Sequence, residues 1–147
     1  MLREQIQEDL KQAQLSRDEI KVSTLRLLLS EIKNIEIQKQ TESLSDQDIV
    51  SAVAKEVKKR KEAAAGFRSG EREQQALKEE AEAKILEGYL PAQLTNEELT
   101  KLVEDSITEV GASTIADIGK VMGIVMGKVS GKADGGTVSA IVKERLS

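Results

Sequence analysis

A single proline, Pro91, divides this sequence. It stands in the stretch Gly88–Glu98, which also holds the only tyrosine, Tyr89. Proline lacks an N–H and disfavours helix at the residue before it, so a helix that arrives from the N-terminal side must end there. Four residues later, Thr95 and Glu98 have the spacing of a capping box, in which each side chain accepts a backbone N–H of the other residue. The stretch therefore predicts a helix end followed closely by a helix start.

The sequences on the two sides of this stretch differ in character. Residues before it are highly charged and almost free of glycine, whereas those after it are more apolar and interrupted by glycines. Taken by itself, the stretch is explained by an ordinary helix–helix connection inside one domain. The change in composition favours a domain junction, with an N-terminal helical domain at 1–90, a C-terminal helical domain at 95–147 and a flexible hinge between them.

Apolar residues recur at helical spacing throughout, and no segment shows the alternation of a strand. Aromatic residues make up only 1% of the chain, so the core must consist of Leu, Ile, Val, Ala and Met, which suits packed helices. Four helices are expected before the proline, at residues 1–15, 16–40, from 45 to an end marked by glycines 66 and 70, and 71–87. Three are expected after it, at 95–110, from 113 to Gly127 or Gly131, and 134–146. The fold class is predicted to be all-α, with an N-terminal four-helix region and a small C-terminal three-helix domain.

Local signals set the expected helix ends. Ser16 and Glu19 have capping-box spacing, and Ser45 precedes two acidic residues that suit the first turn of a helix. Ser113 and Asp134 are the expected caps of the last two helices. Glycines 66, 70 and 111 are expected to end helices.

The chain contains no cysteine and no histidine. This removes thiolate nucleophiles, disulfides, the usual zinc ligands and the imidazole base. The segments 123–128 and 127–132 resemble a phosphate-binding loop, but each has three residues between its glycines where that loop requires four. The sequence therefore predicts no catalytic residues, no cofactor and no metal, and leaves a helical binding or interaction module.

The expected location is the cytoplasm, by default. No secretory signal opens the chain, and the longest apolar runs fall far short of the roughly 20 residues of a membrane span, so no membrane partner is expected. The formal net charge of −4 argues against broad coating by nucleic acid, although a local basic site is compatible with it.

Two groups of residues are candidates for such a site. Lys55 and residues 58–61 put five basic residues within seven, but the interleaved glutamates favour a solvated helix face. The second group comprises the glycines at 119, 123, 127 and 131, and the lysines at 120, 128 and 132 that each follow a glycine. Glycines four residues apart let another backbone approach closely, and tight packing inside the domain is the simplest explanation, with Gly127 or Gly131 ending the helix. The lysines could meet phosphates together with exposed N–H groups, or be scattered surface residues.

Several segments resemble the GatB/YqeY family, in particular its stand-alone YqeY-type members. They are Phe67–Arg72, Tyr89–Leu94, Asp117–Gly123, Gly131–Gly135 and Val138–Lys143, which occur in family order over most of the chain. Residues 95–147 are similar to the helical tail of the B subunit of glutamyl-tRNA(Gln)/aspartyl-tRNA(Asn) amidotransferase.

The resemblance implies a two-part helical protein with a tRNA-related role, because that tail contacts tRNA. Kinase and transamidation chemistry lies in domains that this chain lacks, so the carbon–nitrogen ligase activity associated with the family has no residues here to perform it. The resemblance carries over six candidate RNA contacts: Gly119, Lys120, Gly123, Lys128, Gly131 and Lys132. Related sequences commonly have proline at position 127, which supports Gly127 as a helix end. The expected partner is tRNA, and the alternative is a protein partner docked on apolar helix faces.

Overall fold

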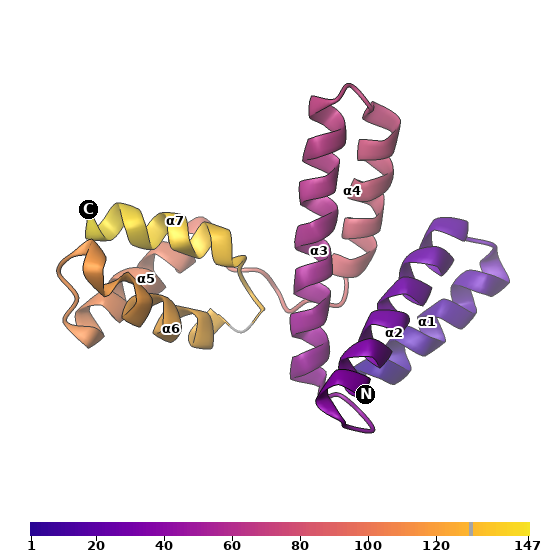
Figure 1. Ribbon diagram of the computed structural model, residues 1–147, viewed down its shortest axis with the longest axis horizontal. Helices are drawn as coiled ribbons and strands as arrows, with labels where there is room; N and C mark the ends of the chain where they lie inside the picture. Colours follow the sequence, from indigo (N-terminus) through magenta and orange to yellow (C-terminus); the bar gives the residue numbers. More distant parts are fainter. Residues whose placement is uncertain (130) are drawn as a thin grey trace. The chain divides into compact units, whose positions relative to one another are not determined.

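The computed structural model describes residues 1–129 and 131–147. In these residues the chain forms seven α-helices and one three-residue 3-10 turn, with no β-strand (Figure 1). The helices are α1 (Leu2–Ser16), α2 (Glu19–Lys39), α3 (Asp46–Ser69), α4 (Glu73–Glu87), α5 (Asn96–Val110), α6 (Ile118–Val129) and α7 (Gly135–Leu146). The 3-10 turn η1 (Ile115–Asp117) leads directly into α6. The predicted all-α fold is confirmed.

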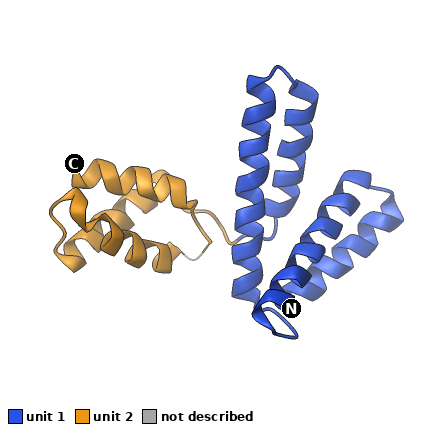
Figure 2. Cartoon of the chain, viewed as in Figure 1, with its two compact units in different colours: residues 1–90 blue, residues 91–147 orange. Residues whose placement is uncertain are grey.

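Backbone contacts group the chain into two compact units, which are residues 1–90 (unit 1) and residues 91–147 (unit 2) (Figure 2). Each unit has its own cluster of buried apolar side chains. The division falls between Leu90 and Pro91, inside the stretch where the sequence suggests a junction. That the units behave as separate domains, at 1–90 and 95–147, and that the junction is a flexible hinge stay predictions.

Unit 1 consists of two antiparallel helical hairpins, α1–α2 and α3–α4 (Figure 1). Its core is formed by large aliphatic side chains, most of which recur at helical spacing on the inner faces of these helices. They are Ile6, Leu25, Leu28, Ile32, Ile49, Val53, Val57 and Leu86, joined by Leu44 from the connection between α2 and α3.

The N-terminus of α2 differs from the prediction. The Asp18 carboxylate accepts the N–H of Lys21 at 3.1 Å and caps the helix. Ser16 instead ends α1, and its hydroxyl donates to the carbonyl oxygen of Ala13. The left-handed residue Arg17, with φ of 59°, makes the turn between the helices and leaves the next residue at the cap position. The predicted capping box at Ser16 is therefore wrong.

The ends of α3 follow the prediction in part. The Ser45 hydroxyl accepts the N–H of Asp48 at 3.2 Å, as expected of an N-cap. The helix continues through Gly66, where an added Cβ would meet nothing within 4 Å, and ends at Gly70. Glu71 has φ of 59°, so α4 starts two residues later than predicted.

Polar contacts through Asp46, Glu36 and Tyr89 tie α1 to the rest of unit 1. Arg3 donates to Glu36, whose side chain is only 2% exposed and also accepts the N–H of Leu44 at 3.0 Å. The hydrogen bond from Arg3 holds the pKa of Glu36 below its usual value. The Tyr89 hydroxyl donates to Asp9 at 2.5 Å, and burial, followed by this hydrogen bond, raises the pKa of Tyr89 above its usual value. Tyr89 thus fastens the end of unit 1 to α1, just before the connection to unit 2.

Unit 2 is a bundle of α5, α6 and α7 around a core rich in valine. Its buried members are Leu99, Val103, Val121, Val125, Val129, Val138, Val142 and Leu146. Both hydrogen bonds of the predicted capping box between Thr95 and Glu98 are present, at 3.1 and 3.2 Å. Gly111 ends α5 with φ of 68°, and Asp134 caps α7, as predicted.

One predicted cap of unit 2 is wrong. The side chain of Ser113 caps no helix, and its N–H donates to the Asp117 carboxylate at 3.2 Å. A 3-10 turn intervenes here and shifts the start of the following α-helix to Ile118. In the described part of the chain, no single helix is long and apolar enough to span a membrane; α5 and the segment Ile115–Val129 reach that length and composition only as a pair bent by 96°.

Candidate nucleic-acid interface

The candidate residues lie on α6 and on the turn that follows it. Gly119, Gly123 and Gly127 are all exposed and helical, so Gly127 does not end the helix as expected. An added Cβ at any of the three would meet nothing within 4 Å. Packing inside unit 2 therefore does not explain these glycines, and the prediction of tight packing within the domain is wrong for them. We call this exposed face of α6 the glycine face.

Replacing Gly123 with alanine should raise the unfolding free energy of the chain by about 0.5–1 kcal/mol. Glycine inside a helix is less stable than alanine by roughly that amount, and the new methyl group has open space. Urea unfolding monitored by circular dichroism measures the change. The control is Gly111→Ala, which should destabilise because φ of 68° strains any residue with a Cβ. If Gly123→Ala lowers the unfolding free energy instead, the added methyl group must meet other atoms, and the glycine face is not open.

The lysines of α6 point in different directions. Lys120 is exposed and lies seven residues before Gly127, which is nearly two helical turns, so it shares the glycine face. Lys128 lies toward α5, where its ammonium group is 2.7 Å from a carboxylate oxygen of Glu109. The two lysines therefore do not converge on one spot.

The turn after α6 is fixed by the start of unit 2. Gly131 has φ of 84°, a left-handed conformation that favours glycine. Its carbonyl oxygen accepts from the Gln93 side chain at 3.0 Å, and the carbonyl oxygen of Lys132 accepts the N–H of Leu94 at 2.8 Å. Gly131 thus has a conformational role, and the exposed side chain of Lys132 projects from a turn held at two points.

Charge in unit 2 is separated by helix. Residues 118–147 carry five basic and two acidic side chains, whereas residues 91–117 carry one basic and six acidic ones. Lys128 and Arg145 each pair with a glutamate of α5, at 2.7 and 3.4 Å. Lys120, Lys132 and Lys143 form no ion pair with any residue that the structure describes. These three ammonium groups are available to an anionic ligand.

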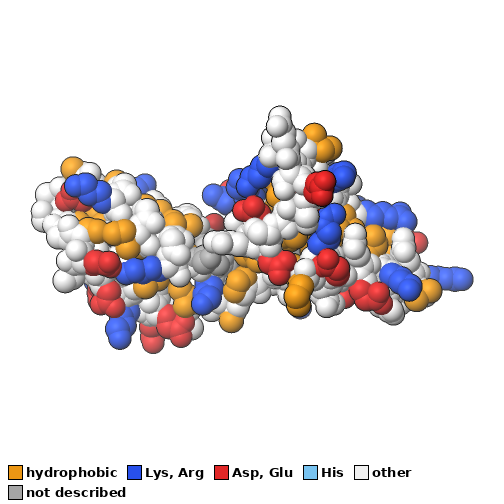
Figure 3. All heavy atoms as spheres, turned by 90° about the horizontal axis from the view of Figure 1, so that it is seen from below, with side chains coloured by type: hydrophobic (Ala, Val, Ile, Leu, Met, Phe, Trp, Pro, Cys, Tyr) orange, Lys and Arg blue, Asp and Glu red, His pale blue; other side chains and the backbone are white. Residues whose placement is uncertain are grey.

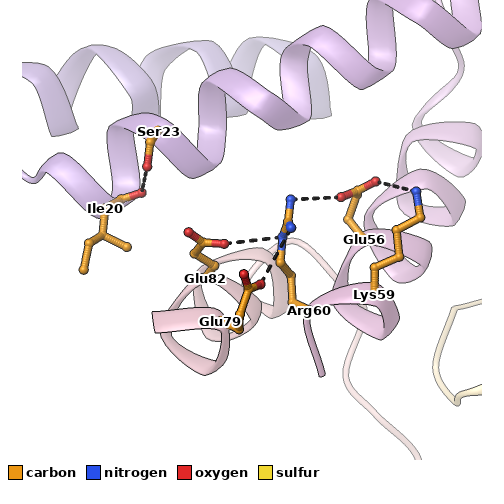
Figure 4. A network of polar contacts seen from close by, with 7 residues as sticks. All are labelled: Ile20, Ser23, Glu56, Lys59, Arg60, Glu79 and Glu82. Carbon is orange, nitrogen blue, oxygen red and sulfur yellow. Dashed lines mark hydrogen bonds and ion pairs between the residues drawn. The ribbon is translucent and has the colours of Figure 1, made fainter. Parts of the chain in front are cut away.

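The basic residues of α3 are placed differently. Arg60 lies among three carboxylates, with Glu56 at 3.4 Å, Glu79 at 3.7 Å and Glu82 at 3.4 Å (Figure 4). Burial, followed by the nearby charge of Glu79, raises the pKa of Glu82. Three carboxylates around one guanidinium make this region anionic, which disfavours a phosphate there.

The remaining lysines of α3 are partly engaged. Lys61 pairs with Glu87 at 2.7 Å, and Lys59 pairs with a glutamate of its own helix at 3.3 Å. Lys55 and Lys58 are exposed and have no ion pair among the described residues. The predicted solvated helix face agrees with the four exposed lysines but not with Arg60, whose side chain is 23% exposed. Lys58 and Lys59 are suitable controls for binding experiments.

Surface charges are mixed on the face of the molecule shown in Figure 3. Basic and acidic side chains are interspersed on it, with hydrophobic side chains between them. Binding of nucleic acid here would rest on a few phosphate contacts rather than on a broad basic surface.

Sequence reasoning missed two features of this interface. Lys143 was overlooked because no glycine precedes it, although its place in the predicted last helix could have revealed it. The pairing of Lys128 with Glu109 joins residues 19 apart on different helices and has no local signal. In the described residues, no three Asp or Glu side chains are grouped so that they could hold a metal ion.

The family model described as "Yqey-like protein" matches residues 3–146 of the chain. The protein named "Altered inheritance of mitochondria protein 41, mitochondrial" is 35% identical over 85 residues in Vanderwaltozyma polyspora and 38% identical over 87 residues in Kluyveromyces lactis. These matches cover 58% and 59% of this chain but only 46% and 47% of the relatives, so the chain matches about half of their length. In Saccharomyces cerevisiae (strain YJM789) the protein of that name is 29% identical over 121 residues, which cover 78% of this chain and 65% of the relative.

These names overturn one expectation. The sequence suggested the cytoplasm by default, but the relatives are named as mitochondrial proteins, so the predicted location is wrong. The default rested on the lack of a recognised targeting signal, which is a weak argument. The family match covers nearly the whole chain. The chain therefore belongs to the family of YqeY-like proteins.

Proposed function

We propose that this chain is a non-catalytic tRNA-binding accessory module and that unit 2 makes the contacts with RNA. The observation that carries the proposal is the separation of charge in unit 2, which leaves Lys120, Lys132 and Lys143 without ion pairs to described residues. Lysines of this kind contact phosphates as point charges and carry no base information. The module thus binds folded RNA through contacts between lysine side chains and the phosphate backbone of the RNA.

The glycine face of α6 supports a close-fitting ligand. Glycine lets a ligand approach a helix backbone closely, but it lowers helix stability. In unit 2 the three exposed glycines gain no packing contact in return. A ligand that approaches the glycine face would account for the three glycines. Lys120 lies on the same face and suits an anionic ligand. The expectation from the sequence that residues 95–147 resemble a tail that contacts tRNA implies the same class of ligand.

The proposal is tested with the full chain and two tRNA transcripts of different sequence. Both should bind at low salt with similar affinity, and both should dissociate as salt rises, because phosphate contacts release counterions. Filter binding or fluorescence anisotropy measures this. Failure of both transcripts to bind at low salt would refute the proposal.

A protein–protein adaptor is the second candidate function. Ile115 and Met126 are 48% and 36% exposed, and both lie in the segment that carries the glycine face. Apolar side chains beside glycines suit a second helix that packs closely. Copurification with and without nuclease separates the candidates. A defined protein partner that survives nuclease treatment, together with no binding of tRNA, would favour the adaptor.

A further inference from the structure

We propose that Glu109 limits the affinity of unit 2 for phosphates by occupying Lys128. A phosphate would contact Lys128 only after displacing this carboxylate. The inference rests on the proposed function, because it concerns how strongly the same unit binds RNA. Glu109, an acidic residue on α5, would thus weaken the binding of RNA.

The geometry makes the two anions direct competitors. The ammonium group of Lys128 lies 2.7 Å from a carboxylate oxygen of Glu109, which is the distance of a charge-assisted hydrogen bond. Both side chains remain accessible, at 39% exposed for Lys128 and 57% for Glu109. Phosphate and carboxylate oxygens are acceptors of the same kind for an ammonium group. An incoming phosphate can therefore reach the lysine, but it must replace an existing partner.

Fold stability does not explain the charge of Glu109. The residue lies in the last turn of α5, where the negative end of the helix dipole disfavours an acid. Exposed ion pairs contribute little to stability, and the left-handed Gly111 ends the helix. Lys128 lies in the last turn of α6, where the dipole favours a cation with or without its partner. The clearest consequence of the Glu109 charge is thus to neutralise a base that a ligand could use.

A second pair of the same type involves α5 and α7. Arg145 on α7 lies 3.4 Å from Glu104 on α5. Glu104 precedes Glu109 by somewhat more than one helical turn. The acidic helix thus neutralises one base on each of its two neighbours. Glu109 has the shorter contact of the two and is the better residue to test.

The test compares Glu109→Gln with Asp105→Asn in the full chain, using a tRNA transcript as the probe. Both substitutions remove one negative charge, and the two positions are one turn apart on α5. Asp105 is exposed and has no ion pair among the described residues. If Glu109→Gln frees Lys128 for a phosphate, the decrease of log affinity with log salt should become steeper by roughly 0.7–0.9 units. That corresponds to about five- to eightfold tighter binding at 0.1 M salt, whereas Asp105→Asn should change affinity less than about twofold, because exposed charges are screened.

The double variant Glu109→Gln/Lys128→Ala identifies the source of the gain. Affinity should return to about the wild-type value, since the freed lysine is gone. Equal effects of Glu109→Gln and Asp105→Asn, or a gain that persists without Lys128, would overturn the inference while the wild type still binds tRNA. Binding by Glu109→Gln but not by the wild type would support the block at Lys128 but would refute the proposed function of the wild-type chain. If neither binds, both the inference and the proposed function fail.

Discussion

Replacing Glu36 with alanine is expected to lower the melting temperature of the chain by roughly 10 °C. Glu36 is buried against α1 and accepts hydrogen bonds from Arg3 and from the N–H of Leu44. The substitution leaves Arg3, which is only 25% exposed, without its carboxylate and the N–H of Leu44 without an acceptor. Breaking a buried pair by removing one partner is far more damaging than losing a surface ion pair. Differential scanning calorimetry measures the change.

The matched control is Glu36→Gln, which keeps an acceptor for Leu44 but has no charge for Arg3. Its melting temperature should fall between those of the wild type and Glu36→Ala. A decrease of less than about 3 °C for Glu36→Ala would show that the contact is not part of the stable core. Comparison of the two variants separates the hydrogen bond to the backbone from the ion pair.

The contribution of Glu36 should also depend on pH. Its pKa is lower in the folded chain than in the unfolded chain, so the stabilisation is fully present above the unfolded value of about 4.3. It is lost as pH falls through the lower, folded pKa. The stability difference between the wild type and Glu36→Gln should therefore be largest near neutral pH and shrink below about pH 4. A difference that stays constant down to pH 3 would contradict the assignment.

The elements that sequence reasoning predicted well are those with local causes. The capping box at Thr95, the left-handed Gly111 and the Asp134 cap each need only a few neighbouring residues. Helical spacing of aliphatic residues was enough for the all-α fold, because the chain has almost no aromatic residues and no strand-like alternation.

The errors arose where neighbouring signals compete. Ser16 and Asp18 are both good caps, and the left-handed Arg17 decided between them. Gly66 and Gly127 were predicted to end helices, but in both places the helix continues through the glycine. Glycine in a helix costs only about 1 kcal/mol, which the packing of neighbouring residues on the buried face can exceed.

The candidate site could be predicted only in part because its geometry is non-local. Sequence spacing identified Lys120 and the glycines four residues apart, and both follow from helical periodicity. It could not show that Lys128 turns away toward Glu109 on another helix. Nor could it show that Gln93 and Leu94 hold the turn that carries Lys132.

Replacing Lys120 and Lys132 with alanine together is expected to weaken tRNA binding by roughly 25- to 60-fold at 0.1 M salt. Each lysine that contacts a phosphate contributes about 0.7–0.9 units to the slope of log affinity against log salt. Loss of two contacts should therefore reduce the slope by about 1.4–1.8 units. The effect should be similar for tRNAs of different sequence, since phosphate contacts carry no base information.

The control is Lys58→Ala/Lys59→Ala on α3, which removes the same charge from unit 1. It should change affinity and slope much less, because Lys59 is already paired with a glutamate and the neighbouring Arg60 cluster is anionic. Circular dichroism spectra of both double variants should match the wild type. Lys120, Lys132 and Lys58 have no ion pair among the described residues, and Lys59 has only an exposed pair on its own helix.

The decisive measurement is the salt dependence of tRNA affinity for the wild type and these two double variants, titrated side by side. We predict a flatter slope for Lys120→Ala/Lys132→Ala and a slope near that of the wild type for Lys58→Ala/Lys59→Ala. The opposite pattern, with binding abolished by the α3 pair and unchanged by the unit 2 pair, would place the RNA site on unit 1 and contradict the proposed interface.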